Sequence, residues 1–244
     1  MHSHMISSSR TLARRPRLSV VIPVLNEERI IDACLTALES QAEPPEQIIV
    51  VDNGSTDATP EIVRRHPDVT LLFEPVRGIG GARTRGFDGA TGDVLARIDA
   101  DTVVSPGWSV AARDAFARDP GLAAAGGPAV AQRLPVPLAK ALYSAFRVFH
   151  RTLFRVPMIM YGHNMALRAD VWQMIRPILS ADDSISEDVD VTLAVLSTGG
   201  RIALLRDMRV EADVLRTLAP AKLARYWHAD SETRRKYREL ARAQ

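Results

Sequence analysis

Short apolar runs alternate with amphipathic stretches along the first hundred residues. Four runs, at 18–23, 48–51, 69–73 and 94–98, are continuous and typical of strands buried on both faces of a sheet. Between them, apolar residues recur at helical spacing, most clearly at Ile30, Ile31, Cys34, Leu35 and Leu38. The pattern predicts helices that open at 26–28, run from 59 to about 65, and span about 82–90.

This alternation predicts an α/β fold with a mostly parallel, Rossmann-like sheet flanked by helices. Crossovers between parallel strands are right-handed, so the carboxyl ends of the strands meet at one edge of the sheet. Ligands bind outside that edge in folds of this class. We therefore expect one domain with its ligand site at the carboxyl edge.

Polar side chains follow three of the four predicted strands. Asn26 and Glu27 follow the first strand, Asp52 follows the second, and Asp99 and Asp101 follow the fourth. If the chain stays extended beyond residue 98, the two last carboxylates face the same spot. A divalent cation, Mn²⁺ or Mg²⁺, with phosphate oxygens in its shell would relieve their repulsion. The alternative interpretation is a solvated acidic turn.

A glycine-rich loop, Gly78-Ile79-Gly80-Gly81, precedes the third predicted helix. A dinucleotide-binding fingerprint would need glycine at position 83, where this chain has Arg83, and would follow the first strand. The Rossmann cofactor is therefore excluded. Close approach to an anionic ligand and a simple tight turn both remain compatible with this loop.

The composition is that of an ordinary soluble protein of 244 residues with a formal net charge of +2, which gives no indication of nucleic acid binding. The single cysteine, Cys34, fits a reducing compartment. No apolar run approaches a membrane span, and the amino terminus lacks a signal-peptide core. We expect a cytoplasmic protein whose residues 1–17 are a tag remnant and a flexible segment.

The second half continues with a helix from about 105 to 120, a strand at 122–125, a linker at 134–137 and a helix at 138–156. That last helix has an apolar stripe and a basic stripe, the latter made by Lys140, Ser144, Arg147, Arg151 and Arg155. A peripheral contact with the inner face of an anionic membrane is one interpretation. A helix packed on the domain with a solvated basic face is the other.

Several motifs in a fixed order resemble the family-2 glycosyltransferases, which have the GT-A fold. They are Pro23-Val24-Leu25-Asn26-Glu27, Val51-Asp52-Asn53-Gly54-Ser55-Thr56-Asp57, Gly80-Gly81-Ala82-Arg83-Thr84-Arg85-Gly86 and Asp99-Ala100-Asp101. The resemblance runs from about 18 to 202. It implies a donor-binding half at 18–104, an acceptor-side and catalytic half at 105–215 and a basic helix at 216–244.

The resemblance also implies roles for individual residues. Asp52 would contact the nucleotide base, Asp99 the ribose, and Asp101 a metal on the diphosphate. The remaining donor-side positions are Pro23, Asn26, Glu27, Gly80, Arg83 and Ala100. The segment Tyr161-Gly162-His163-Asn164 would line the acceptor side, through Gly162, His163 and Asn164.

Glu187 and Asp188 follow Ser186 at the start of a predicted helix. Taken alone, they are acidic first-turn residues favoured by the helix dipole. The resemblance makes them the catalytic pair, with Asp188 as general base. Arg97 stands in the fourth strand where the family usually has an apolar residue, and the sequence gives it no partner.

The sequence therefore predicts a metal-dependent inverting glycosyltransferase that moves a sugar from a nucleoside-diphosphate sugar to a hydroxyl, on a lipid-linked acceptor or a glycan. A non-catalytic nucleotide-sugar-binding protein is the main alternative. A sugar nucleotidyltransferase is less favoured, because Asn26-Glu27-Glu28 stands where such enzymes carry a basic glycine-rich loop. The sugar, the base and the acceptor remain open.

Overall fold

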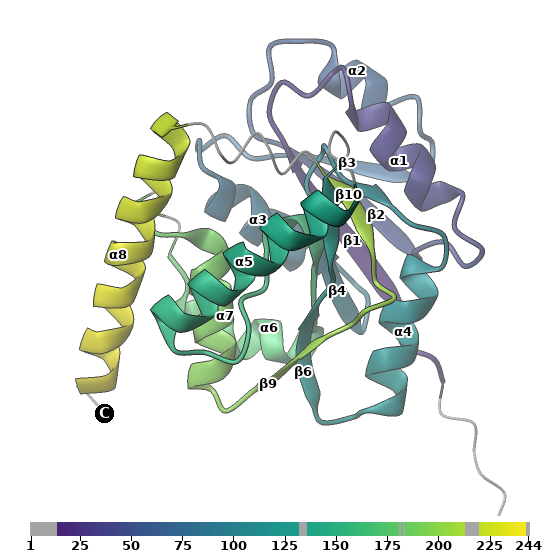
Figure 1. Ribbon diagram of the computed structural model, residues 1–244. Coiled ribbons are helices and arrows are strands. Elements are labelled where there is room, and N and C mark those ends of the chain that lie inside the picture. The colour runs from purple at the N-terminus through teal and green to yellow at the C-terminus, as the bar shows by residue number, and fades with distance from the viewer. Residues whose placement is uncertain (1–13, 132–135, 181, 183, 213–219, 243–244) are drawn as a thin grey trace, which may run out of the picture.

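A seven-stranded sheet forms the centre of the part of the chain that the computed structural model describes, residues 14–131, 136–180, 182, 184–212 and 220–242 (Figure 1). Its strands are Leu18–Val24 (β1), Gln47–Asp52 (β2), Val69–Phe73 (β3), Val94–Arg97 (β4), Leu122–Gly126 (β6), Met165–Arg168 (β8) and Arg201–Leu204 (β9). They lie in the order β3-β2-β1-β4-β8-β6-β9. The predicted α/β fold with a mostly parallel sheet is confirmed.

The four strands of the amino-terminal half are parallel, so their carboxyl ends share one edge. The carboxyl-terminal half joins them through β8, which is antiparallel to both β4 and β6. In this pairing Arg97 lies opposite Met165. The end of β4 and the segment before β8 therefore meet at the same edge of the sheet.

Helices cover both faces of the sheet. The helices are Ile31–Glu39 (α1), Thr59–Val63 (α2), Ile79–Asp88 (α3), Trp108–Arg118 (α4), Val136–Phe154 (α5), Ala169–Ile175 (α6), Glu187–Ser197 (α7) and Pro220–Arg242 (α8). Apolar residues of α1 and α4 pack on one face of the sheet. Those of α3, α6 and α7 pack on the other, where Phe87 meets Trp172 edge to face at 4.9 Å.

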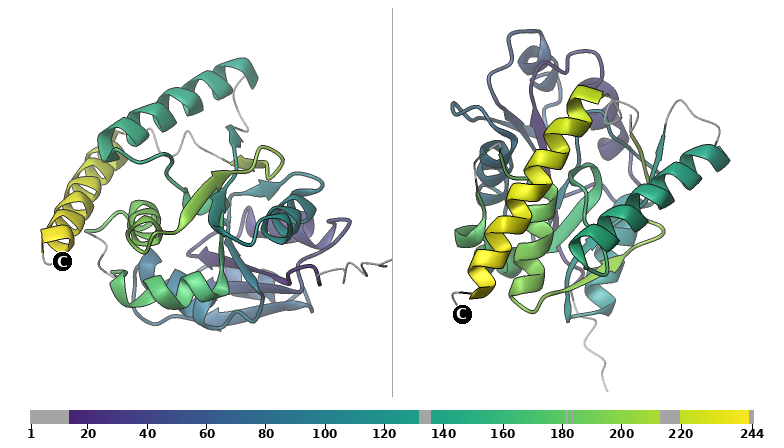
Figure 2. Two further views of the ribbon diagram at one scale, coloured as in Figure 1. Left: turned by 90° about the horizontal axis from the view of Figure 1, so that it is seen from below. Right: turned by 60° about the vertical axis from the view of Figure 1, so that its left-hand side comes forward.

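A second, three-stranded sheet stands beside the first. It consists of Val103–Val104 (β5), Ala129–Ala131 (β7) and Val210–Ala212 (β10), with β10 in the middle. Helices α5 and α8 lie on the outside of the molecule, and the two views of Figure 2 show them close together on one side. Phe149 of α5 stacks on Trp227 of α8, with ring centroids 6.4 Å apart.

The first helix begins later than the sequence predicts. Residues 26–28 were expected to open it, but α1 starts at Ile31. Asn26 has a positive φ of 57°, which a right-handed helix does not allow. The backbone N–H groups of residues 26–28 instead hydrogen-bond to side chains after β2. These bonds hold the segment outside the helix.

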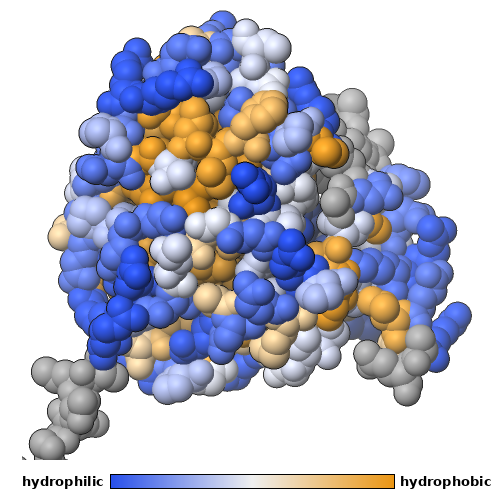
Figure 3. Space-filling view, turned by 180° about the vertical axis from the view of Figure 1, so that it is seen from behind, coloured by the Kyte–Doolittle hydropathy of each residue, from blue (hydrophilic) through white to orange (hydrophobic). Residues whose placement is uncertain are grey.

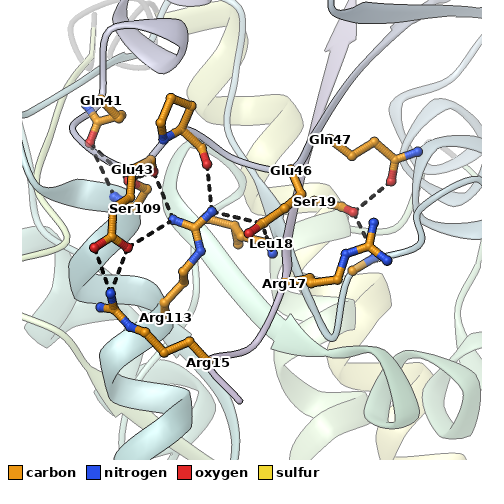
Figure 4. A network of polar contacts seen from close by, with 12 residues as sticks. Arg15, Arg17, Leu18, Ser19, Gln41, Glu43, Glu46, Gln47, Ser109 and Arg113 are labelled. Carbon is orange, nitrogen blue, oxygen red and sulfur yellow. Dashed lines mark hydrogen bonds and ion pairs between the residues drawn. The ribbon is translucent and has the colours of Figure 1, made fainter.

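The end of the sheet opposite to the predicted site is fastened by a buried arginine (Figure 4). Arg113 of α4 donates to the backbone oxygens of Glu43 and Pro44, at 2.9 and 2.7 Å, and pairs with Glu46 at 2.8 Å. Arg15 pairs with Glu43 at 2.7 Å. Residues 14–17 of the segment predicted to be flexible therefore contact the domain, and residues 1–13 lie outside the described residues.

The predicted linker at 134–137 falls partly on residues 134 and 135, which lie outside the described residues, and α5 already begins at Val136. The expected boundary at 215/216 lies outside the described residues as well. Within the described chain, no helix is long and apolar enough to cross a membrane.

Candidate active site

The loops after β1 and β2 are joined by hydrogen bonds at the carboxyl edge of the sheet. Asn26 N–H donates to Ser55 Oγ at 2.9 Å, and Asn26 Oδ1 accepts from Thr56 N–H at 2.8 Å. Glu27 N–H donates to Thr59 Oγ1 at 2.8 Å. Because these bonds use backbone donors, they fix the shape of both loops.

Asn53 extends this arrangement to the loop after β3. Its amide donates to the backbone oxygens of Glu74 and Val76, at 2.9 and 2.7 Å, and its Oδ1 accepts from Gly78 N–H at 2.8 Å. The Asn53 side chain therefore positions the start of α3, the helix that carries Gly80 and Arg83.

Asp52 ends β2 and is 7% exposed. Its Oδ1 accepts from Ser55 N–H at 3.0 Å. It borders a pocket with apolar walls, lined by Asp52, Pro60, Arg64, Leu71, Leu72 and Phe73. Figure 3 shows apolar side chains gathered in the upper part of the back face, where β2 and β3 lie.

The Asp99-Ala100-Asp101 segment forms a turn. The expected extended geometry beyond residue 98 is wrong, because β4 ends at Arg97 and Thr102 N–H donates back to the Asp99 backbone oxygen at 3.1 Å. The strand register sets Val24 beside Asp52 and Val21 beside Arg97. Asp52 and this turn are thus two strands apart, about 10 Å.

A buried guanidinium gathers carboxylates at the end of β4. The Arg97 side chain is 3% exposed, and its Nη2 donates to Asp99 Oδ1 at 2.8 Å. Its Nη1 pairs with Glu187 and lies 3.3 Å from Asp188 Oδ1. The partner that the sequence did not reveal is therefore the acidic pair at the start of α7.

Arg83 is the second buried cation of this cluster. Its Nη1 donates to Glu187 Oε1 at 2.8 Å, and its guanidinium lies over the Trp172 ring, 5.7 Å from the centroid. Arg83 is fully buried. Arg83 was predicted to lie near the nucleotide. In the described part of the chain it forms an ion pair with Glu187.

The two carboxylates of the acidic pair differ in acidity. Burial opposes the ionisation of Glu187, but the charges of Arg97 and Arg83 outweigh burial and lower its pKa to about 2. Burial and the charge of Glu187 raise the pKa of Asp188 well above its usual range, although Arg97 acts against them. Opposite shifts of this kind at adjacent carboxylates are typical of acid–base sites.

The predicted acceptor segment also reaches this cluster. Gly162, His163 and Asn164 form a 3-10 turn. A Cβ atom on Gly162 would lie 2.2 Å from Arg97 Nη1. Burial lowers the pKa of His163 to about 4, and its ring stacks on Tyr161.

Asn164 has a structural partner set. Its Oδ1 accepts from Trp108 Nε1 at 2.9 Å, and its Nδ2 donates to the Met208 backbone oxygen at 2.7 Å. The side chain is 1% exposed. These bonds hold the 3-10 turn against α4 and the segment before β10, so both polar ends of the amide are occupied within the fold.

No group of three or more His, Cys, Asp or Glu suitable for a metal occurs among the described residues. The turn at 99–101 still fits a hard cation, because it presents carboxylate oxygens of Asp99, 38% exposed, and of Asp101 on one short segment. A cation there needs further oxygen ligands, which a diphosphate supplies.

Helix α8 supports the start of α7. Asp190 is completely buried and pairs with Lys236 at 2.6 Å. Tyr237 donates to the Asp190 backbone oxygen at 2.9 Å, and Ser186 N–H donates to Thr233 Oγ1 at 2.8 Å. The helix that carries Glu187 and Asp188 is thereby held from its outer side.

The structure therefore brings together Arg83, Arg97, Asp99, Gly162, Glu187 and Asp188. Asp52, Asn26 and Glu27 stand on the same edge, but their bonds are to neighbouring loops. Arg97 was not among the predicted site residues. The sequence feature that indicates it is a charged residue within an otherwise apolar strand.

The model of the family described as glycosyl transferase family 2 matches residues 19–174. The chain belongs to this family. The putative glycosyltransferase EpsH of Bacillus subtilis is 32% identical over 97 residues, which are 38% of this chain and 28% of that protein. Glycosyltransferase AglE of Haloferax volcanii is 38% identical over 100 residues, or 38% of this chain and 33% of AglE. The matched segment thus spans about a third or less of these relatives.

Solved structures share the GT-A fold with this chain. The mannosyltransferase PcManGT of Pyrobaculum calidifontis, in complex with GDP-Man and Mn²⁺, has a TM-score of 0.64 at 25% identity, covering 83% of this chain and 58% of that one. Glucosyl-3-phosphoglycerate synthase of Mycobacterium tuberculosis, in complex with Mn²⁺, UDP and glucosyl-3-phosphoglycerate, has a TM-score of 0.59 at 20% identity, covering 88% and 79%.

Proposed function

We propose that this chain is an inverting glycosyltransferase that moves a sugar from a nucleoside-diphosphate sugar to a hydroxyl acceptor. The observation that carries the proposal is the meeting of Asp99, Glu187 and Asp188 around the buried Arg97. The Arg97 guanidinium thus contacts both Asp99, in the donor-side turn, and Asp188, the carboxylate with the raised pKa. A protein that only binds nucleotide sugars has no use for the second group.

In the proposed donor site, the nucleotide lies along the carboxyl edge of the sheet. The distance of about 10 Å between Asp52 and the 99–101 turn suits a base at one end and a diphosphate at the other. Asp99 accepts hydrogen bonds from the ribose hydroxyls. Pro23, Glu27 and Gly80 line the donor site between Asp52 and the 99–101 turn. The Mn²⁺ complexes of the structural relatives support a divalent cation at Asp101.

Asp101 would hold that cation, which would supply positive charge against the departing diphosphate. Asp188 takes the proton of the acceptor hydroxyl as it attacks the sugar from the face opposite the diphosphate. Burial and the neighbouring Glu187 raise the pKa of Asp188, which suits a base that must accept a proton. Glu187 stays ionised and holds both arginines, and the 162–164 turn lies beside the acceptor.

Product analysis tests this proposal. Incubation with UDP-glucose or GDP-mannose and Mn²⁺ should release nucleoside diphosphate, with water taking the sugar in place of the acceptor. Asp188→Asn should remove most of this turnover while donor binding stays nearly intact. Release of pyrophosphate from a nucleoside triphosphate and a sugar phosphate would instead identify a nucleotidyltransferase. An Asp188→Asn variant with full rate would refute Asp188 as the base.

We further propose a peripheral contact between α5 and an anionic membrane surface, which would bring the site to a lipid-linked acceptor. The segment 120–169 contains no Asp or Glu, while α5 carries Lys140, Arg147 and Arg151. Leu138, Val148 and Phe149 of α5 are 48–61% exposed, and so is Trp227 of α8 at 58%. A basic stripe together with exposed apolar residues on the same helix is typical of interfacial helices.

Sedimentation with lipid vesicles tests this contact. We expect binding to vesicles rich in phosphatidylglycerol, weak binding to pure phosphatidylcholine, and loss of binding in Phe149→Ala/Trp227→Ala. Equal binding to both kinds of vesicle, or none to either, would contradict the proposal.

A further inference from the structure

Arg97 connects the two halves of the proposed site. It ends β4, beside the donor-side turn, and its partners Glu187 and Asp188 begin α7, some 90 residues further along the chain. One guanidinium thus contacts three carboxylates, at 2.8 Å for Asp99 and 3.3 Å for Asp188. The other carboxylate, Glu187, is shared with Arg83.

Stability does not account for a charge at this position. Its strand neighbours Val94, Leu95 and Ala96 are buried and apolar, and an apolar residue would continue their pattern. Replacing a buried ion pair by apolar residues is often neutral or stabilising. Moreover, Arg97 Nε is buried and has no hydrogen-bond partner in the described part of the chain, which costs stability. The buried charge at position 97 is therefore better explained by the positions in which it holds the carboxylates than by a gain in stability.

Space for this guanidinium comes from a glycine in the acceptor segment. A Cβ atom on Gly162 would lie 2.2 to 2.6 Å from the three guanidinium atoms Nη1, Cζ and Nη2 of Arg97. Any side chain at position 162 would displace the guanidinium. The clash involves the end of a long side chain and leaves the backbone in place.

We propose that Arg97 is a positioning residue that holds Asp188 and Asp99 in one fixed arrangement, and that Gly162 is required because it leaves room for the Arg97 guanidinium. The inference rests on the proposed function, since it acts through Asp188. A planar guanidinium reaches several carboxylates in defined directions, whereas a lysine ammonium acts as a single point charge. Charge alone therefore does not replace Arg97.

Three variants test the proposal against a matched control. Arg97→Met removes the charge, Arg97→Lys keeps it, and Gly162→Ala displaces the guanidinium without changing any charge. Arg113→Met is the control, because Arg113 is a comparably buried arginine, 4% exposed, that pairs with Glu46 at the opposite end of the sheet. Turnover is the release of nucleoside diphosphate from UDP-glucose or GDP-mannose with Mn²⁺, with water taking the sugar in place of the acceptor.

All three test variants should lower kcat by about 10- to 100-fold, and by more than they raise the KM for the donor, because misplaced groups cost rate more than affinity. The kcat of Arg97→Lys should be no closer to the wild-type value than that of Arg97→Met. Arg113→Met should lower the urea midpoint but leave kcat within about twofold, since it lies far from the reacting groups. Equal kcat losses in Arg97→Met and Arg113→Met would overturn the proposal.

A double-mutant cycle separates this proposal from the proposed function. If Arg97 acts in part through Asp188, the rate loss in Arg97→Met/Asp188→Asn is smaller than the product of the two single losses, and the two changes shift the urea midpoint non-additively. Multiplying rate losses or additive midpoint shifts would overturn the positioning role while leaving the base assignment intact. Absence of turnover in the wild type would count against the proposed function, and the midpoint cycle would still decide the role of Arg97.

Discussion

At the scale of single residues, the buried cluster gives two adjacent carboxylates opposite properties. Glu187 has two guanidinium partners, and its ionised form is favoured. Asp188 has a more distant contact with Arg97, at 3.3 Å, and lies beside the charge of Glu187. The first turn of α7 thus carries one carboxylate that stays ionised, Glu187, and one that readily binds a proton, Asp188.

This difference predicts opposite effects of two isosteric changes on unfolding free energy. The folded-state pKa of Asp188 is raised, so its ionisation destabilises the fold as pH rises from the unfolded value, about 3.9, toward the folded one. Asp188→Asn should therefore gain stability relative to the wild type as the pH rises above about 4, because the amide does not ionise. Urea unfolding at several pH values measures this difference.

Glu187→Gln should behave in the opposite way. The pKa of Glu187 is lowered to about 2, so its stabilising effect is complete above the unfolded value of about 4.3 and disappears as pH falls toward the folded one. The variant should lose about 3 kcal/mol at neutral pH, because two buried guanidinium groups lose their counterion. A stability difference that does not change with pH in either variant would contradict the assigned shifts.

How far the sequence predicts the site also depends on the residue. Asp99, Asp101, Glu187 and Asp188 were identified from their motifs. The contact of Arg97 with Gly162 was not, because it requires β8 to pair antiparallel with β4. A partnership between residues so far apart in the chain leaves no periodic signal in the sequence.

At the scale of elements, the strands with continuous apolar runs were predicted closely. Burial on both faces holds for β1, β2 and β4, but it is wrong for β3, an edge strand whose Thr70 and Phe73 are exposed. Val69–Phe73 has the predicted bounds, and the other long strands differ by one or two residues. The short strands β5, β7 and β10 were missed, since two or three residues carry no period, and the four-residue β8 was missed as well. The start of α1 was misplaced because loop hydrogen bonds, rather than helix propensity, determine residues 26–28.

The contact between α7 and α8 leads to a prediction about stability. Lys236→Met leaves the carboxylate of Asp190, which is completely buried, without its cation. Unfolding free energy should fall by about 2–3 kcal/mol, somewhat less than for a fully buried pair because Lys236 is 21% exposed. Chemical denaturation measures the loss.

Arg235→Met on the same helix is the matched control. Arg235 pairs with Glu232 at the surface and is 64% exposed, so its removal should cost no more than about 1 kcal/mol. Equal losses in the two variants would show that α8 does not support α7 through Asp190.

At the scale of the whole molecule, a donor site on the sheet edge makes stability depend on ligand. A donor at about 100 times its dissociation constant should stabilise the fold by roughly 2.7 kcal/mol. A thermal-shift screen of UDP-glucose and GDP-mannose, with and without Mn²⁺, should show one donor that acts mainly with the metal. Asp101→Ala should abolish the Mn²⁺-dependent part of the shift.

The most direct measurement is a crystal structure with Mn²⁺ and the nucleoside diphosphate that the screen selects. Our account predicts an anomalous manganese peak within bonding distance of the Asp101 carboxylate, the base beside Asp52, and the acidic pair of α7 facing the outer phosphate. A manganese ion and nucleotide bound away from the carboxyl edge of the sheet would contradict it.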